Sequence, residues 1–137
     1  MSSSSPWGVI QYVEKIAPGC RFVGTSSHGG MMLTEKFAKK HLTLAALRRG
    51  MRHGNYYCYE EDCAWAIPAY ELSQYWDRIF AYFKPAEGPE LYLFKSLSAW
   101  NADYLLERGI EPDPVLFQRY KEFHRRLQEN VFLLTES

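Results

Sequence analysis

The chain has 137 residues, of which 47% are hydrophobic and 16% aromatic, and its 16 basic and 16 acidic residues cancel. This length suits one core, so we expect a single domain over residues 7–137 behind a disordered tail at residues 1–6. Zero net charge argues against a general attraction to nucleic acid, and an odd set of three cysteines argues against a disulfide framework. With no secretion signal and no long apolar stretch, the composition predicts a soluble cytoplasmic protein without membrane contact.

The first predicted elements are strands, because β-branched and aromatic residues are concentrated between Gly8 and Leu33. Turn residues at 17–19 and at 26–30 divide this stretch into three segments. We therefore expect a small antiparallel meander near the N-terminus.

Helices are predicted to follow the meander. Thr34 precedes a glutamate, as at many helix N-termini, and Gly50 would end this helix. Thr43 is placed to restart the helix after a break. Residues 50–55 contain two glycines and little that would hold a regular element, so we expect a loop there.

The middle of the chain is also expected to be helical. Apolar residues recur at helical spacing over residues 59–70, which predicts a helix that begins near Glu60 and is bent or split by Pro68. The same spacing continues over residues 72–83 and predicts a regular core helix.

The last third is predicted to contain a short strand at 91–94, a helix over 96–108 and a final helix from Asp113, with residues 131–134 as a packed tail or edge strand. The apolar stripe of the final helix would comprise Leu116, Phe117, Tyr120, Phe123, His124 and Leu127. Together these elements predict an α+β fold, in which four to five helices pack on a small antiparallel sheet.

One candidate for chemistry is His28, which lies between hydroxyl residues and the pair Gly29–Gly30. It could act as a general base, with Cys63 as nucleophile and Glu60 or Asp62 orienting the imidazole. Alternatively, the glycines supply positive-φ conformations for a tight turn that the histidine side chain holds by hydrogen bonds.

The acidic neighbours of Cys63 favour a structural role for this thiol. Nearby carboxylates would raise its pKa, and its helical phase predicts a place on a buried apolar stripe. Glu60, Glu61 and Asp62 would then cap the helix N-terminus. A metal site built from His28, Cys63 and a carboxylate lacks paired ligand spacing, so we expect no metal and no cofactor.

Two surfaces are candidates for binding a partner. The aromatic and acidic one comprises Glu60, Glu61, Asp62, Trp65 and Tyr70, and the basic one comprises Lys39, Lys40, Arg48 and Arg49. Aromatic side chains near charge are typical anchors of protein interfaces. Alternatively, the rings pack inward, and the two charged runs are solvated helix faces that attract each other.

The strongest signal in the sequence is a combination of four motifs. Its motifs are Trp7-Gly8, Ile16-Ala17-Pro18-Gly19, Ser27-His28-Gly29-Gly30 and Tyr59-Glu60-Glu61-Asp62-Cys63-Ala64-Trp65-Ala66. Between Trp7 and about Trp76 the chain resembles a family of small uncharacterised domains of bacteriophages, plasmids and integrated elements. The resemblance implies a protein that acts on host systems from within the host cytoplasm. It leaves open whether the recurring residues form a shared site or a shared structural lock.

These observations lead to three functional hypotheses. The leading one is a phage-type or plasmid-type protein that binds a host or defence-system protein, as an anti-CRISPR protein does. The second is a small hydrolase or transferase with the His28, Cys63 and carboxylate site. The third is a nucleic-acid-binding module that uses the basic segment 36–52. For each, we expect the histidine loop and the Glu60–Trp65 segment to be neighbours in space.

Overall fold

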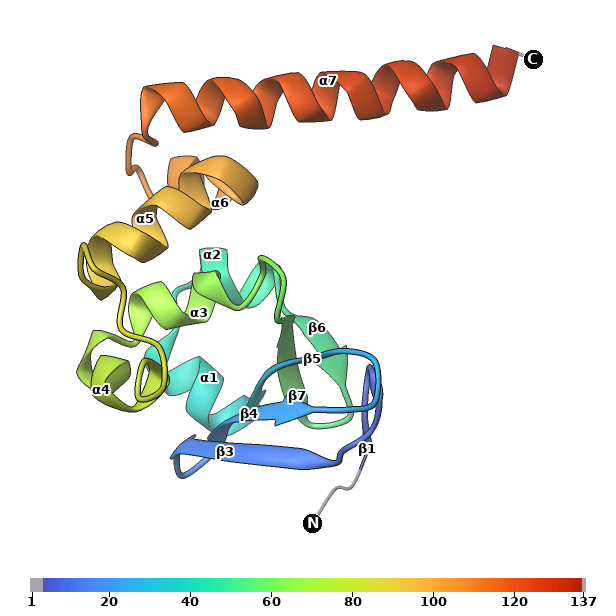
Figure 1. Cartoon of the computed structure of the whole chain (residues 1–137). Coiled ribbons are helices and arrows are strands. Elements are labelled where there is room, and N and C mark those ends of the chain that lie inside the picture. The colour runs from blue at the N-terminus through green and yellow to red at the C-terminus, as the bar shows by residue number, and fades with distance from the viewer. Residues whose placement is uncertain (1–3, 137) are drawn as a thin grey trace.

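The computed structural model describes residues 4–136 and shows a five-stranded antiparallel sheet with helices packed on one face (Figure 1). The sheet order is β3-β4-β5-β7-β6, with β3 (Tyr12–Ala17), β4 (Cys20–Gly24), β5 (Gly29–Thr34), β6 (Met51–His53) and β7 (Tyr56–Glu60). The predicted meander is confirmed as β3 to β5, since each of these strands pairs with the next.

The N-terminal segment is structured where a disordered tail was expected. Within residues 4–6, β1 (Ser4–Ser5) pairs with β2 (Gly8–Val9), and the Ser5 hydroxyl donates a hydrogen bond to the Gly8 carbonyl. Trp7 then packs on the side of the sheet that faces away from the helices. Burial of this indole explains the order of the segment, because it removes a large apolar surface from water. Residues 1–3 of the predicted tail lie outside the described residues.

The first two helices agree with their sequence signals. Thr34 caps α1 (Glu35–His41) by accepting a hydrogen bond from the Phe37 N–H, and Thr43 caps α2 (Leu44–Arg48) in the same way. The predicted break and restart are therefore confirmed.

Residues 51–60 were predicted wrongly. They form a hairpin of β6 and β7, with Gly54 at φ +57° in the turn, instead of a loop followed by a helix. The run from Tyr56 to Tyr59 suits a strand because aromatic residues have high strand propensity. Its alternate side chains Tyr57 and Tyr59 enter the core under the helices. A short apolar run such as this fits the two-residue repeat of a strand as well as the 3.6-residue repeat of a helix. Pairing with β5 favours the strand.

The next helix begins six residues later than predicted, at α3 (Ala66–Glu71). Pro68 does not split α3, because it lies in the first turn, where a missing N–H removes no intrahelical hydrogen bond. The regular helix expected over 72–83 is reduced to the 3-10 helix η1 (Ser73–Tyr75) and the short α4 (Trp76–Ile79).

The C-terminal part consists of α5 (Pro89–Trp100), α6 (Ala102–Glu107) and α7 (Pro114–Glu136). The predicted strand at 91–94 lies inside α5, and the predicted helix over 96–108 is divided at Asn101. The start of α7 agrees with the prediction, since the Asp113 carboxylate accepts hydrogen bonds from the N–H groups of the next turn. Residues 131–134 continue α7 as a helix instead of the predicted edge strand, and the exposed side chains of Val131 and Leu134 do not fit a packed tail.

The main core lies between the sheet and the helices. Its fully buried large side chains include Met31, Leu33, Tyr59, Ile67, Leu72, Leu93, Leu97, Tyr104 and Leu105. The α+β fold class is confirmed, although the described residues contain seven α-helices where four to five were expected. Within residues 4–136, no helix combines the length and the apolar character needed to cross a bilayer.

Candidate functional site

The two stretches singled out in the sequence are neighbours in space, as predicted. Strand β5 begins with Gly29–Gly30 and pairs with β7, so that Gly30 lies opposite Glu60. The Glu61 N–H also donates a hydrogen bond of 3.0 Å to the Gly29 carbonyl. The histidine loop and the acidic turn therefore meet at one end of the same strand pair.

Close packing explains the two glycines. A Cβ atom at Gly30 would lie 2.3 Å from the Tyr59 carbonyl oxygen and 2.6 Å from Cη2 of Trp7. A Cβ atom at Gly29 would lie 2.3 Å from the Val23 carbonyl oxygen. Neither glycine has a positive φ, so the expected turn conformation is not the reason for the pair.

Thr25, not His28, holds the loop between β4 and β5. The Thr25 hydroxyl donates to the His28 carbonyl at 2.6 Å and accepts from the His28 N–H at 3.1 Å. The His28 residue is exposed, and its ring makes no hydrogen bond within the described part of the chain. The imidazole is accessible, but nothing orients it for proton transfer.

Glu60 closes the turn between β7 and α3. Its carboxylate accepts hydrogen bonds from the N–H groups of Asp62 (2.7 Å), Cys63 (3.0 Å) and Ala64 (2.9 Å). Partial burial acts to raise the pKa of Glu60, but the three backbone donors outweigh it and hold the pKa below its usual value. The side chain of Asn101 donates to the Cys63 carbonyl and ties the turn to the end of α5.

The same turn keeps Cys63 as a thiol. Its Sγ donates to the Glu60 carboxylate at 3.2 Å, and burial together with this acceptor raises the pKa of Cys63 to about 11. Cys63 lies half-buried in the turn ahead of α3, which corrects the prediction of a helical apolar stripe. Because a nucleophilic cysteine must be a thiolate, this environment does not favour the hydrolase hypothesis.

The aromatic residues of this region are turned partly inward. Trp65 packs edge to face against Phe22 and Phe80, at ring centroid distances of 5.8 and 6.1 Å. Tyr70 is half-buried beside a shallow hollow between α3, α4 and the start of α5. Of the predicted acidic and aromatic binding surface, Glu61 and Asp62 are exposed.

The predicted basic surface is largely engaged in ion pairs. Arg48 and Arg49 both contact Glu107 at 2.8 Å, and Arg49 also contacts Asp103, so α2 is joined to α6. Lys39 pairs with Glu35 on its own helix, whereas Lys40 is an exposed residue of α1. The basic run thus attracts acids, as one alternative held, but the acids are Glu35, Asp103 and Glu107, and not those of the Glu60–Asp62 run.

A buried carboxylate that the sequence did not reveal joins three helices. Glu71 of α3, with a side chain 4% exposed, accepts hydrogen bonds from Tyr104 and Arg108 near α6 and from Thr43 at the cap of α2. These partners are 28 to 37 residues away in sequence. No local pattern could identify them.

Helix α7 is the other feature that sequence analysis misjudged. Its first part packs on α5, and Phe123 contacts Trp100 edge to face at 5.9 Å. The C-terminal part of α7 stands clear of the rest of the fold (Figure 1). The side chains of Phe123, Leu127 and Val131 are 47%, 45% and 60% exposed, so the predicted apolar stripe is only half covered.

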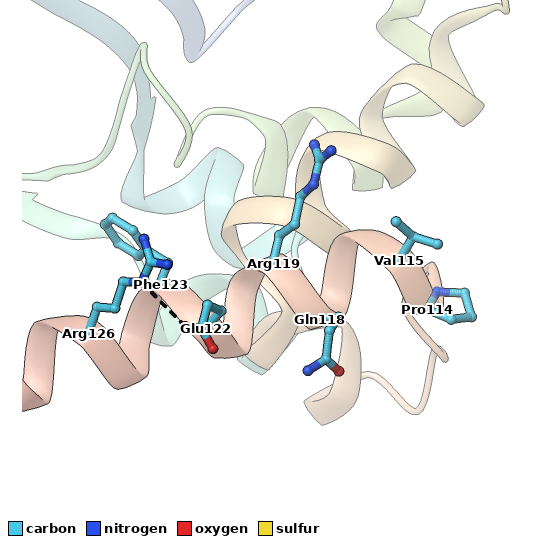
Figure 2. Close-up of a pocket in the computed structure, with 7 residues that line it drawn as sticks. All are labelled: Pro114, Val115, Gln118, Arg119, Glu122, Phe123 and Arg126. Carbon is cyan, nitrogen blue, oxygen red and sulfur yellow. Dashed lines mark hydrogen bonds and ion pairs between the residues drawn. The ribbon is translucent and has the colours of Figure 1, made fainter.

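A hollow of about 770 Å³ runs along the first turns of this helix. Figure 2 shows its lining residues, all of which lie on α7: Pro114, Val115, Gln118, Arg119, Glu122, Phe123 and Arg126. The hollow is open to solvent and combines apolar side chains with two arginines. Because its whole lining belongs to one helix, it is an open strip of helix surface and does not enclose a small substrate.

In fold class, this protein is a small α+β domain with an antiparallel sheet, a hydrogen-bonded β7–α3 turn and a projecting C-terminal helix. A family model described as "Domain of unknown function (DUF7007)" matches residues 1–126, and the chain belongs to that family. The resemblance to uncharacterised domains is confirmed at this level, and it extends beyond Trp76. Comparison with curated proteins and with solved structures gave no match.

Proposed function

We propose that this protein is a binding module that acts through contacts with another protein, and that α7 carries its docking surface. The observation that supports this is the exposed apolar face of α7, formed by Phe123, Leu127 and Val131, which begins at the contact of Phe123 with the end of α5. Exposed apolar side chains at spacings of four residues are the anchors with which one amphipathic helix binds another.

The charges around this face favour an acidic partner. At about 100° per residue, Arg119 and Lys121 flank the apolar face on its two sides. The acids Glu122 and Glu129 lie on the opposite side of the helix, where both pair with Arg125. A second copy of the chain would bring like charges together, so the occupant we propose is an amphipathic helix with acidic flanks.

The resemblance noted in the sequence supports a narrower form of the proposal. In that form the protein comes from a bacteriophage or plasmid, acts in the cytoplasm of a bacterial host and binds a component of a defence complex. The hydrolase alternative has less support, because Cys63 is held as a thiol and Glu60 is occupied by backbone donors. The nucleic-acid alternative is weakened by the ion pairs of Arg48 and Arg49.

The test uses a designed amphipathic helical peptide with a leucine seam and glutamate flanks, and a second peptide with lysine flanks. We expect the glutamate peptide to bind the whole chain at least tenfold more tightly in fluorescence anisotropy. The Leu127→Glu variant should lose about tenfold in affinity, since it removes a leucine side chain that the peptide would bury and adds repulsion. Gln118→Glu, on the opposite face of α7, is the matched control and should bind as the unaltered chain does.

Equal binding of the two peptides, or unchanged binding by Leu127→Glu, would contradict the proposal. Concentration-dependent dimers that disappear in Leu127→Glu would instead identify a second copy as the occupant. For the narrower form, expression of the chain in a bacterium with an active defence system should raise phage plating. Leu127→Glu should abolish this gain while Gln118→Glu keeps it.

A further inference from the structure

A second hollow lies on the face of the sheet that is turned away from the helices. It has a volume of about 360 Å³, and its lining includes Val13, Lys15, Arg21, Met32 and Tyr56 from four strands or their ends. This volume is near the lower end of the range of about 300–1,000 Å³ that is usual for small-molecule sites. No part of the proposed α7 surface contributes to it.

Two basic residues of this hollow, Lys15 and Arg21, lie opposite each other on neighbouring strands. Lys15 and Arg21 are direct cross-strand partners in the β3–β4 pair. Like charges directly opposite each other destabilise a sheet. Within residues 4–136, neither side chain forms an ion pair with a carboxylate, whereas most other arginines of the chain do.

The Arg21 guanidinium is held in place by an aromatic ring. It lies 5.4 Å from the centroid of Tyr56, and its Nη2 donates to the Tyr56 hydroxyl at 3.3 Å. Arg21 is also half-buried, and a partly buried charge costs free energy unless an opposite charge is near. Stacking on Tyr56 leaves the other guanidinium donors available for a planar anionic group.

The remaining wall of the hollow is apolar. Val13 is 47% exposed, Pro18 is exposed beside it, and the buried side chains of Ala17 and Met32 lie beneath them. A ligand that fits this arrangement carries an anionic group at one end and a short hydrocarbon body at the other. We propose that this hollow binds a small amphiphilic anion, with its carboxylate or phosphate between Lys15 and Arg21 and its apolar body against Val13 and Pro18.

The test is isothermal titration of the whole chain with octanoate, octyl phosphate and the neutral 1-octanol. At least one of the two anions should bind, and the comparison between them shows which head group is preferred. Octanol should bind at least tenfold more weakly, and added salt should weaken only the anions. Arg21→Gln and Lys15→Gln should each reduce anion affinity about fivefold or more, because each removes one charge contact.

Lys40→Gln, which removes an exposed charge from α1, is the matched control and should bind like the unaltered chain. Circular dichroism of each variant separates lost binding from lost folding. The proposal is overturned if neither anion binds, if octanol binds equally well, or if both hollow variants keep full affinity. The α7 variant Leu127→Glu should leave anion binding unchanged, so failure of one proposal is distinguishable from failure of the other.

Discussion

At the scale of single residues, close packing at its glycines explains the Ser27-His28-Gly29-Gly30 motif. Gly30 brings β5 so close to β7 and Trp7 that any side chain would collide with backbone. His28 itself is exposed at the loop. The motif therefore acts first as a packing device that lets the N-terminal indole cover the sheet.

Gly30→Ala should destabilise the fold by about 1–3 kcal/mol or more, because the added methyl group overpacks a site lined by backbone. The measurement is the free energy of unfolding in urea. Gly24→Ala is the control: its Cβ would lie 3.4 Å from the exposed ring of Tyr12, which can move aside. A similar loss of unfolding free energy in the two variants would show that the backbone freedom of glycine, and not the collision of an added Cβ with backbone atoms, matters at Gly30.

At the scale of elements, two carboxylates that each accept several hydrogen bonds connect neighbouring helices and strands. Glu60 closes the turn that leads from β7 into α3, and Glu71 joins α3 to α2 and α6. Buried polar groups of this kind are tolerated because all of their hydrogen bonds are made. Within the described residues, no buried side-chain nitrogen or oxygen lacks a partner.

Glu60→Gln should cost about 2 kcal/mol of stability at neutral pH, since the hydrogen bonds lose the charge that strengthens them. The pKa of Glu60 is lower in the folded chain than in the unfolded one. Its contribution is therefore complete above the unfolded pKa and is lost as the pH falls through the folded pKa. Urea unfolding at several pH values should show the difference between the two proteins shrinking in acid; a constant difference would mean that ionisation is irrelevant.

At the scale of the whole molecule, a compact domain is joined to a helix that extends beyond it. Phe123 contacts Trp100 of the domain, and the exposed apolar residues Leu127 and Val131 follow it along α7. The matched family region ends at residue 126, close to this point. The projecting part is therefore suited to contacts with a partner and adds little to the domain.

Removal of residues 127–137 should change the melting temperature by less than about 3 °C, because little buried area is lost. Differential scanning calorimetry measures this, and helical circular dichroism should fall while near-ultraviolet signals stay. Binding of the acidic helical peptide should disappear. A large drop in melting temperature would show that the domain needs the distal helix and would contradict the separation of roles.

Local signals in the sequence determined the meander, the threonine caps of α1 and α2, the start of α7 and the α+β class. Capping and turn residues act on their near neighbours, and for that reason they can be recognised without the fold. The nearness of the histidine loop and the acidic turn was also foreseen, and β5–β7 pairing realises it.

Only the tertiary structure decided between strand and helix at Tyr59 and Glu60, fixed the hydrogen-bonded, half-buried surroundings of Cys63, and separated the buried from the exposed parts of the α7 stripe. Each depends on partners far away in sequence: β5 beside Tyr59, Asn101 beside the Cys63 turn, and the end of α5 beneath Phe123. An apolar pattern states that a surface must be covered. The pattern does not show whether the surface is buried by the same chain or by a partner. For this physical reason, the candidate binding face could be recognised only in the folded molecule.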